Sequence, residues 1–248
     1  MGHSIFEFMV IGFLAQLIDG ALGMAYGVSS NTFLLSLGIS PAVASASVHA
    51  AEVFTTGVSG LSHWRLGNVD KDLLKRLVLP GVLGGAVGAY VLTEMPTQVI
   101  KPIVAIYLAV MGIVILRRAM RPVEEREVRT ALGPLGVIGG FFDAIGGGGW
   151  GPIVTSTLVA RGNSPRFTIG SVSMTEFFVT LTQSIVFVLT LTLTLENAEI
   201  ILGLLIGGVL AAPLAAFAAR HIPARPLMMA VGVLIIILSV RTLILATR

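Results

Sequence analysis

The sequence of 248 residues has no cysteine and few charged residues, 12% in all. Without cysteine, a disulfide framework and thiol chemistry are excluded. Soluble domains carry about 25% charged residues, whereas this chain combines few charges with 55% hydrophobic residues and a mean hydropathy of +0.93. The composition and its long apolar runs therefore indicate an all-α polytopic membrane protein.

Nucleic acid, metal ions and cofactors are not expected as partners. The net charge is +3, but the basic residues lie in short loops between apolar runs, where they orient a chain in the bilayer. A metal site is disfavoured because the sequence has no cysteine, no histidine pair at ligand spacing and no dense group of carboxylates. The glycine run Gly146–Gly149 has neither a preceding strand nor a following Walker lysine, so it is not a nucleotide loop.

One stretch stands out, FDAIGGGGWGP from Phe142 to Pro152. Each glycine costs a helix interior about 1 kcal/mol relative to alanine, so the run Gly146–Gly149 should break the helix. Unwound backbone at membrane depth is tolerated only where it is buried in protein or lines a wet cavity. The stretch is therefore either a packed crossing point or a binding site.

The same pattern occurs twice in the chain. A shift of 124 residues places Asp143 on Asp19 and Glu176 on Glu52. The shift also places Gly147 on Gly23, Trp150 on Tyr26, Gly151 on Gly27, Gly162 on Gly38, Ser164-Pro165 on Ser40-Pro41 and Ser171 on Ser47. The duplication divides the chain into a first repeat (1–118), a cytoplasmic connecting loop (119–130) and a second repeat (131–248).

Each repeat is expected to hold one glycine-broken helix pair and three transmembrane helices. The broken pairs cover 4–37 and 131–161, and each is too long for a single crossing of roughly 20 residues. The spans that follow are 41–62, 73–93 and 98–117 in the first repeat, and 165–193, 198–219 and 226–245 in the second.

The basic residues test two arrangements of the broken pairs. If each pair crosses the membrane, the 16 Lys and Arg residues divide 11 against 5 between the two sides. If each pair re-enters, leaving by the face through which it came, they divide 13 against 3, which obeys the positive-inside rule better. Three crossings per repeat then invert the second repeat relative to the first. Inverted repeats with broken helices are typical of transporters.

Four acidic residues lie inside the apolar runs, as the repeat-related pairs Asp19/Asp143 and Glu52/Glu176. A carboxylate at this depth costs roughly 2.5–3.5 kcal/mol, so each needs a partner or a proton. Asp19 and Asp143 could cap the half-helices that follow them, and Glu52 or Glu176 could hold a coupling proton. His49 lies three residues from Glu52 on the same helical face, which favours Glu52 for that role.

The two broken loops are the expected substrate site. Free N–H groups at helix N-termini attract anions, and glycine allows a close approach, so a small anion is the expected occupant. The predicted binding residues are Gly23, Gly27, Ser47, His49, Gly146, Gly147, Gly148, Gly149, Gly151 and Ser171. The serines could instead serve helix packing, and His49 could be a hydrogen-bonded core residue. The counterpart of His49 is Ser173, which makes the site asymmetric.

The motifs resemble one known family. IDGALGMAYG and FDAIGGGGWGP, the Gly-x-Ser-Pro turns at Gly38–Pro41 and Gly162–Pro165, and HWRLGNVD at His63–Asp70 resemble the TauE/SafE (sulfite exporter, TSUP) membrane proteins. The resemblance covers essentially the whole chain. It implies a secondary transporter in the inner (cytoplasmic) membrane, not an enzyme, that exports small sulfur-containing anions such as sulfite or sulfoacetate, with or without coupling to protons.

Two other hypotheses stay open on the residues alone. One is a passive anion channel. The other is an intramembrane enzyme in which Asp19 and Asp143 share a proton as an acid–base pair.

Overall fold

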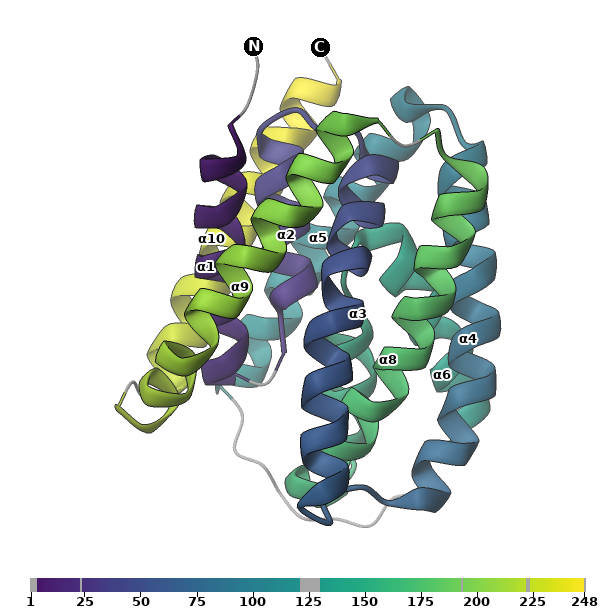
Figure 1. Ribbon diagram of the computed structural model, residues 1–248, viewed down its shortest axis with the longest axis vertical. Coiled ribbons are helices and arrows are strands. Elements are labelled where there is room, and N and C mark those ends of the chain that lie inside the picture. Colours follow the sequence, from purple (N-terminus) through teal and green to yellow (C-terminus); the bar gives the residue numbers. More distant parts are fainter. Residues whose placement is uncertain (1–3, 23, 121–129, 193, 222–223, 248) are drawn as a thin grey trace.

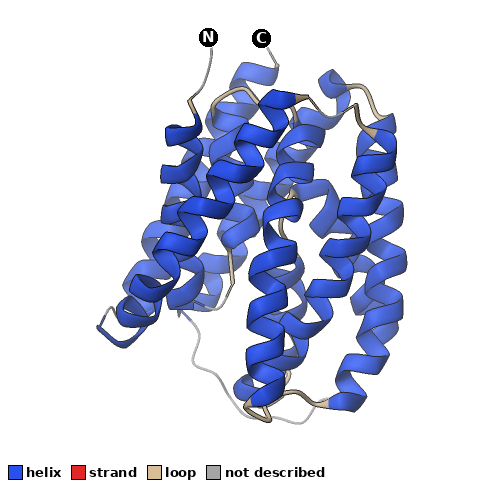
Figure 2. Ribbon diagram, viewed as in Figure 1, coloured by secondary structure: helices blue, strands red, loops and turns tan. Residues whose placement is uncertain are grey.

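The computed structural model describes residues 4–22, 24–120, 130–192, 194–221 and 224–247. In these ranges the chain is almost entirely helical and has no strand (Figure 2). Four of the described helices are long and apolar enough to cross a membrane, over Lys71–Glu94, Thr97–Met120, Pro165–Thr190 and Arg225–Ala246. The expectation of an all-α membrane protein is confirmed to this extent.

The helices begin and end close to the bounds expected from the sequence. The first half of the chain forms α1 (Ile5–Leu22), α2 (Tyr26–Ser36), α3 (Pro41–Arg65), α4 (Lys71–Glu94) and α5 (Thr97–Met120). The second half forms α6 (Leu132–Gly146), the π-helical turn η1 (Gly151–Thr155), α7 (Ser156–Ala160), α8 (Pro165–Thr190), α9 (Leu195–His221) and α10 (Ala224–Ala246). Most of the predicted connecting loop, 119–130, lies outside the described residues.

Local chemistry explains where several helices begin. Pro41 and Pro165 are the first residues of α3 and α8, where a missing N–H costs nothing. The turns before them hold Gly38 and Gly162 at φ values of 92° and 90°, a left-handed conformation that favours glycine. Asp70 caps α4, because its carboxylate accepts two backbone N–H groups of the first turn at 2.8 and 3.2 Å.

Each broken pair turns back towards the end of the molecule from which it starts (Figure 1). The start of α1 (residues 6–11) and the end of α2 (residues 33–37) line one surface groove. The start of α6 lines another at Leu132, together with Leu158 of α7 and residues 162–164 that follow α7. The α1–α2 pair therefore returns to the end that carries both termini, and the α6–α7 pair returns to the opposite end.

Helix packing is repeated between the two halves of the chain. α1 packs along α9, and α6 packs along α4, which is the same contact after a shift of one repeat. α3 crosses α8, and α5 packs along α10. The backbone N–H of Asp70, after α3, donates to Ser171 Oγ in the second turn of α8 at 2.8 Å. The end of α3 thus meets the start of α8, so the two helices run in opposite directions (Figure 1).

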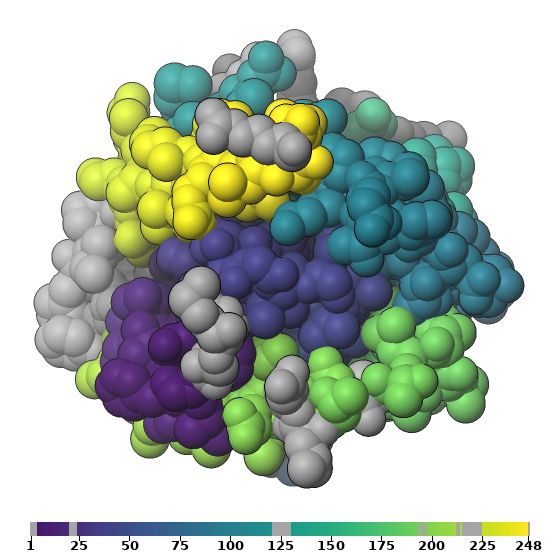
Figure 3. Space-filling view, turned by 90° about the horizontal axis from the view of Figure 1, so that it is seen from above, coloured from purple at the N-terminus to yellow at the C-terminus, as the bar shows by residue number. Residues whose placement is uncertain are grey.

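The end that carries the termini is closed at its centre. In the view onto this end, residues of α2 and the start of α3 (blue) fill the middle of the face. They lie between α1 and α10 (purple and yellow) on one side and the region where α4 ends and α5 begins (teal) on the other (Figure 3). Below this surface the side chains of Leu34 and Val48 are fully buried, at 0% exposure. Any cavity in the middle of the bundle must therefore be reached from elsewhere.

Candidate functional site

Each break is followed by a half-helix whose first N–H groups are capped by the aspartate before the break. Asp19 Oδ1 accepts a hydrogen bond from the backbone N–H of Tyr26 at 3.2 Å. Asp143 Oδ1 accepts from the backbone N–H groups of Gly149 and Trp150 at 2.8 and 2.9 Å. Tyr26 and Trp150 are repeat equivalents, so the two carboxylates make the same kind of cap, which pairs donors that a helix start leaves unpaired.

The two breaks use unusual backbone angles. Gly147 and Gly148 have φ values of 64° and 150°, where glycine is favoured because it has no Cβ. The first break has Ala25 at φ 102°, a left-handed conformation that side chains rarely adopt. Sparsely populated angles of this kind cluster at functional sites, where the surrounding structure holds them.

The breaks pack directly against each other in the middle of the molecule. A Cβ atom on Gly27 would lie 2.7 Å from both Gly147 O and Gly148 Cα, so only glycine fits there. The equivalent glycine, Gly151, faces Met24, with 3.0 Å to its Cβ. Asn31 of α2 adds a hydrogen bond across the crossing, from its side-chain amide to the carbonyl of Gly146.

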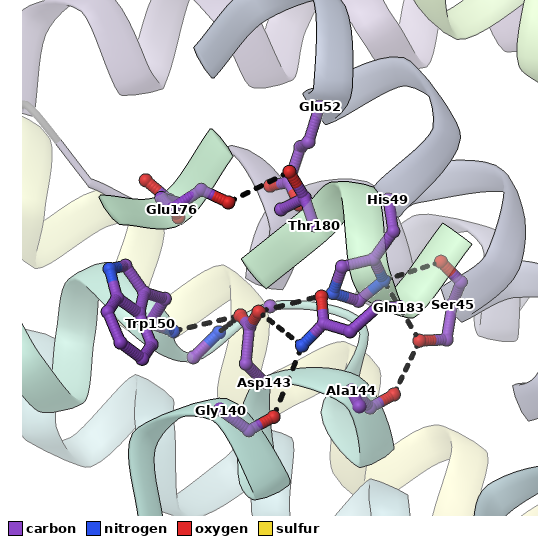
Figure 4. A network of polar contacts seen from close by, with 12 residues as sticks. Ser45, His49, Glu52, Gly140, Asp143, Ala144, Trp150, Glu176, Thr180 and Gln183 are labelled. Carbon is purple, nitrogen blue, oxygen red and sulfur yellow. Dashed lines mark hydrogen bonds and ion pairs between the residues drawn. The ribbon is translucent and has the colours of Figure 1, made fainter. Parts of the chain in front are cut away.

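Asp143 is enclosed by protein groups on every side (Figure 4). Its second oxygen, Oδ2, lies 3.3 Å from His49 Nε2 on α3 and accepts from Gln183 Nε2 on α8 at 3.0 Å. The exposed fractions of His49 and Gln183 are 0%, and that of Asp143 is 1%. Both carboxylate oxygens are therefore paired without any ligand.

The imidazole of His49 must carry a proton on Nδ1. That atom lies 2.7 Å from the carbonyl oxygen of Ser45, which can only accept. The contact between His49 Nε2 and Asp143 needs a second proton, held by one partner or the other, because two acceptors would repel. A hydrogen bond thus joins His49 of the first repeat to Asp143 of the second.

A cavity of about 340 Å³ lies on the other side of the crossing. It touches α3 at Glu52, Thr56, Ser59 and His63, positions that follow one face of the helix from its middle towards its C-terminal end. The remaining lining residues are Gln16, Asp19, Met24, Ala25, Tyr26, Gly27, Val28, Thr55, Gly148, Gly149, Gly151, Pro152, Thr155, Ile169, Val172, Ser173 and Glu176. The cavity therefore reaches from the crossing towards the end opposite the termini.

The cavity is acidic. Asp19, Glu52 and Glu176 line it, while the described lining residues include no Lys or Arg. Glu52 is 4% exposed and its Oε2 has no hydrogen-bond partner. Glu52 and Glu176 lie apart from the network around Asp143 in Figure 4. These buried carboxylates need protons or a ligand to compensate for the loss of water.

The structure divides the predicted site residues into two groups. Those that line the cavity are Asp19, Gly27, Glu52, Gly148, Gly149, Gly151 and Glu176. Those that lie outside it are Ser47, His49, Asp143, Gly146, Gly147 and Ser171. Gly23 falls outside the described residues.

The second group is taken up by contacts within the protein. Gly146 lies against the ring of Tyr107, and Gly147 against the side chain of Asn31. Ser171 accepts the N–H of Asp70, while Ser47 is buried at 1% exposure. These four positions therefore make contacts within the protein and do not face the cavity.

His49 also differs from the sequence-based expectation. The histidine was expected to act with Glu52, three residues along the same helix, but its imidazole pairs with Asp143 of the other repeat. No hydrogen bond joins His49 to Glu52 among the described residues. His49 therefore makes a contact between the two repeats, which helical spacing could not predict.

The N–H groups of the second loop are not free for an anion. Those of Gly147 and Gly148 donate to the Asp143 carbonyl, and those of Gly149 and Trp150 donate to its side chain. In the first break, Gly27 and Val28 belong to the first turn of α2 and line the cavity. The α2 N-terminus is therefore a helix end with positive partial charge that faces the cavity.

Sequence reasoning missed Gln183, Ser59 and Asn31. Gln183 lies seven residues after Glu176, hence on the same face of an otherwise apolar helix, and that spacing could have indicated it. Ser59 could have been identified as the position that the shift of 124 residues pairs with Gln183.

A polar cavity beside two broken helices, inside a bundle with helices of membrane length, is typical of a membrane transporter. The sequence profile described as "Sulfite exporter TauE/SafE" matches residues 8–242, and the chain belongs to this family. It is 45% identical over 249 residues to "Probable membrane transporter protein YtnM" of Bacillus subtilis (strain 168), covering 97% of this chain and 83% of the relative. No solved structure matches the chain significantly. The resemblance seen in the motifs is confirmed, and family and relative both indicate a membrane transporter rather than an enzyme.

Proposed function

We propose that the protein is a secondary transporter of the inner membrane that exports small sulfur-containing anions, of the sulfite or organosulfonate kind, together with protons. The observation that carries the proposal is the 340 Å³ cavity at the crossing of the broken helices, lined by Asp19, Glu52 and Glu176. Its volume suits a small solute, and the N-terminus of α2 beside it favours an anionic group.

The acidic lining supports coupling to protons. Two unit charges 4 Å apart repel by about 4 kcal/mol at an effective dielectric constant near 20. An anion can therefore enter beside Glu52 and Glu176 only if these carboxylates bind protons. The anion and the protons then leave the site together and move in the same direction.

We also propose that the two repeats, 1–118 and 131–248, are inverted relative to each other. The support is the opposite direction of α3 and α8 and the return of the α1–α2 and α6–α7 pairs to opposite ends (Figure 1). The positive-inside rule then puts the end with the α3–α4 loop in the cytoplasm. The cavity reaches towards that end, so this conformation takes up substrate from inside.

A passive channel is less well supported. On α3, Ser45 and His49 lie nearer than Glu52 to the end that carries the termini, and both are fully buried, at 0% exposure. A continuous path would have to pass these side chains, whereas alternating access needs no such path. The acid–base enzyme is also less well supported, because both oxygens of Asp143 are already paired.

The proposed function is tested by flux in proteoliposomes. Vesicles loaded with sulfite, sulfoacetate or thiosulfate should release at least one of them faster than protein-free vesicles, and an imposed pH gradient should drive accumulation. Release of none of the three contradicts the substrate class. A flux that equilibrates the anion but ignores the pH gradient contradicts coupling and favours the channel.

The coupling groups are tested by Glu52→Gln and Glu176→Gln. Glutamine keeps the shape but cannot bind or release the proton, so each variant should exchange substrate and lose accumulation driven by the pH gradient. The greater burial of Glu52 makes the larger loss expected there. If both variants accumulate substrate as the parent does, these glutamates are structural.

The inverted arrangement is tested by single cysteines at the repeat-equivalent positions Ser40 and Ser164. An impermeant maleimide added outside should label the first and spare the second. Labelling of both from one side contradicts the arrangement.

A further inference from the structure

The surroundings of Asp143 and Asp19 differ at two positions. Beside Asp143, the side-chain partners are His49 on α3 and Gln183 on α8. The shift of 124 residues turns these positions into Ser173 on α8 and Ser59 on α3. The repeat relation places α3 on α8 and α8 on α3. Ser173 is therefore the counterpart of His49, and Ser59 is the counterpart of Gln183.

Both serines line the cavity together with Asp19. No hydrogen bond joins Asp19 to Ser59 or Ser173 in the part of the chain that the structure describes. The volume that an imidazole and a carboxamide fill beside Asp143 is thus open beside Asp19. The cavity beside Asp19 thus corresponds to the space beside Asp143 that the side chains of His49 and Gln183 occupy.

Other unpaired atoms around the cavity are hydrogen-bond acceptors. Gln16 Oε1 and Glu52 Oε2 are buried and have no partner, and both residues line the cavity. Buried polar atoms are nearly always paired, and an unpaired one costs free energy. A ligand with hydrogen-bond donors would pair Gln16 Oε1, and Glu52 Oε2 while that carboxylate is ionised, as Gln183 does for Asp143.

We propose that Ser59 and Ser173 determine substrate specificity by keeping this place open, and that the substrate occupies it with a hydrogen-bond donor directed at Asp19. The inference rests on the proposed function and narrows it to small sulfur acids that retain a donor group. The O–H of hydrogensulfite and the ammonium group of an aminosulfonate both meet this requirement. The anionic group of the same molecule lies towards the first turn of α2.

The natural absence of cysteine allows the cavity to be filled after folding. Ser59→Cys and Ser173→Cys should fold and transport, because the change is small. Modification with N-ethylmaleimide, followed by removal of the reagent, should reduce flux by about tenfold or more because the added group overfills the site. Ser62→Cys is the matched control, since Ser62 is exposed on the same helix and does not line the cavity.

The outcomes separate this inference from the proposed function. If the parent protein moves sulfite or a sulfonate, and fully modified Ser59→Cys and Ser173→Cys move it at the unmodified rate, the assignment of the two serines is wrong. If the parent moves none of these anions, the proposed substrate class is wrong, and the proposed requirement for a donor group is wrong with it. Ser173→His and Ser59→Gln provide a second test, since each should lose flux while keeping the parental melting temperature or raising it.

The donor is tested by competition against sulfite flux. Isethionate carries an O–H donor and taurine an ammonium donor, whereas methanesulfonate presents a similar anionic group and has none. Inhibition by either of the first two without inhibition by methanesulfonate supports the inference, and the one that inhibits identifies an O–H or an ammonium as the donor. Equal inhibition by methanesulfonate overturns it.

Discussion

The two repeats hold equivalent aspartates in very different surroundings. Asp143 is buried, and four nitrogen atoms of the protein contact its two oxygens. Asp19 accepts the N–H of Tyr26 and faces a cavity. The same capping device therefore gives a closed polar centre in one repeat and an open one in the other.

The difference shows how a duplicated fold can present one site at a time. The backbone breaks, the caps and the crossing glycines are shared, whereas the side chains that fill the space beside each aspartate are not. The partners that enclose Asp143 include His49 in the N-terminal half of α3, which lies towards the end that carries the termini. The cavity beside Asp19 reaches towards the opposite end of the bundle. A transporter needs such an asymmetry, because both sides must not be open together.

The largest difference in stability between the two repeats is expected when each aspartate is removed. Asp143→Ala leaves His49 Nε2, Gln183 Nε2 and two backbone N–H groups without their partner, and each buried polar group left unpaired costs about 1–3 kcal/mol. Asp19→Ala removes one cap, worth about 1 kcal/mol. Thermal unfolding of the purified proteins in detergent should therefore show a much lower melting temperature for Asp143→Ala. Equal shifts would mean that the two centres are energetically alike.

The crossing glycines give the next largest difference. In Gly27→Ala the new Cβ meets the backbone of Gly147 and Gly148 at 2.7 Å, and overpacking of this kind costs about 1–3 kcal/mol. In Gly151→Ala it meets Met24 Cβ at 3.0 Å, where a smaller displacement of about a few tenths of an ångström relieves the contact. Melting temperature and flux should both fall further for Gly27→Ala. The opposite order would contradict the crossing geometry.

The counterpart positions Gln183 and Ser59 sharpen the comparison. Gln183→Ala removes a donor from the buried Asp143 and should cost about 1–3 kcal/mol. Ser59→Ala removes a hydroxyl that faces the cavity and should change stability by no more than about 0.5 kcal/mol. Denaturation midpoints of the two variants provide the measurement. A loss at Ser59→Ala as large as that at Gln183→Ala would mean that the protein itself uses the serine to hold Asp19.

The smallest effect is expected where the repeats agree. Thr56 Oγ1 donates to the carbonyl of Glu52 at 2.6 Å, and Thr180 Oγ1 donates to that of Glu176 at 2.9 Å. Thr56→Val and Thr180→Val remove these bonds, each worth about 1 kcal/mol or less. The two melting temperatures should fall by the same small amount. A large difference would place the asymmetry in the helix backbone rather than beside the aspartates.

Much of the architecture could be predicted from local patterns. The breaks follow from helix propensity, since glycine runs at membrane depth cannot continue a helix. The bounds of α3 and α8 follow from Pro41 and Pro165. The membrane class and the TauE/SafE family follow from composition and motifs, and both are confirmed.

The candidate site could be predicted only in part. Asp19, Glu52 and Glu176 were expected from their depth, and the three line the cavity. The partner of His49 was expected on its own helix, but it lies 94 residues away in the other repeat. Helical spacing identifies neighbours along one helix, and it carries no information on which helix lies opposite.

The sequence by itself determined that the chain is duplicated, where its helices break and which carboxylates lie at depth, because these properties depend on composition and short-range propensity. The tertiary structure decided which of the duplicated aspartates is enclosed. The side chains that fill or leave the space come from α3 and α8, and Gln183 and His49 lie 40 and 94 residues from Asp143. Only the crossing of these helices brings them to the breaks, so only the folded chain distinguishes the filled centre from the open one.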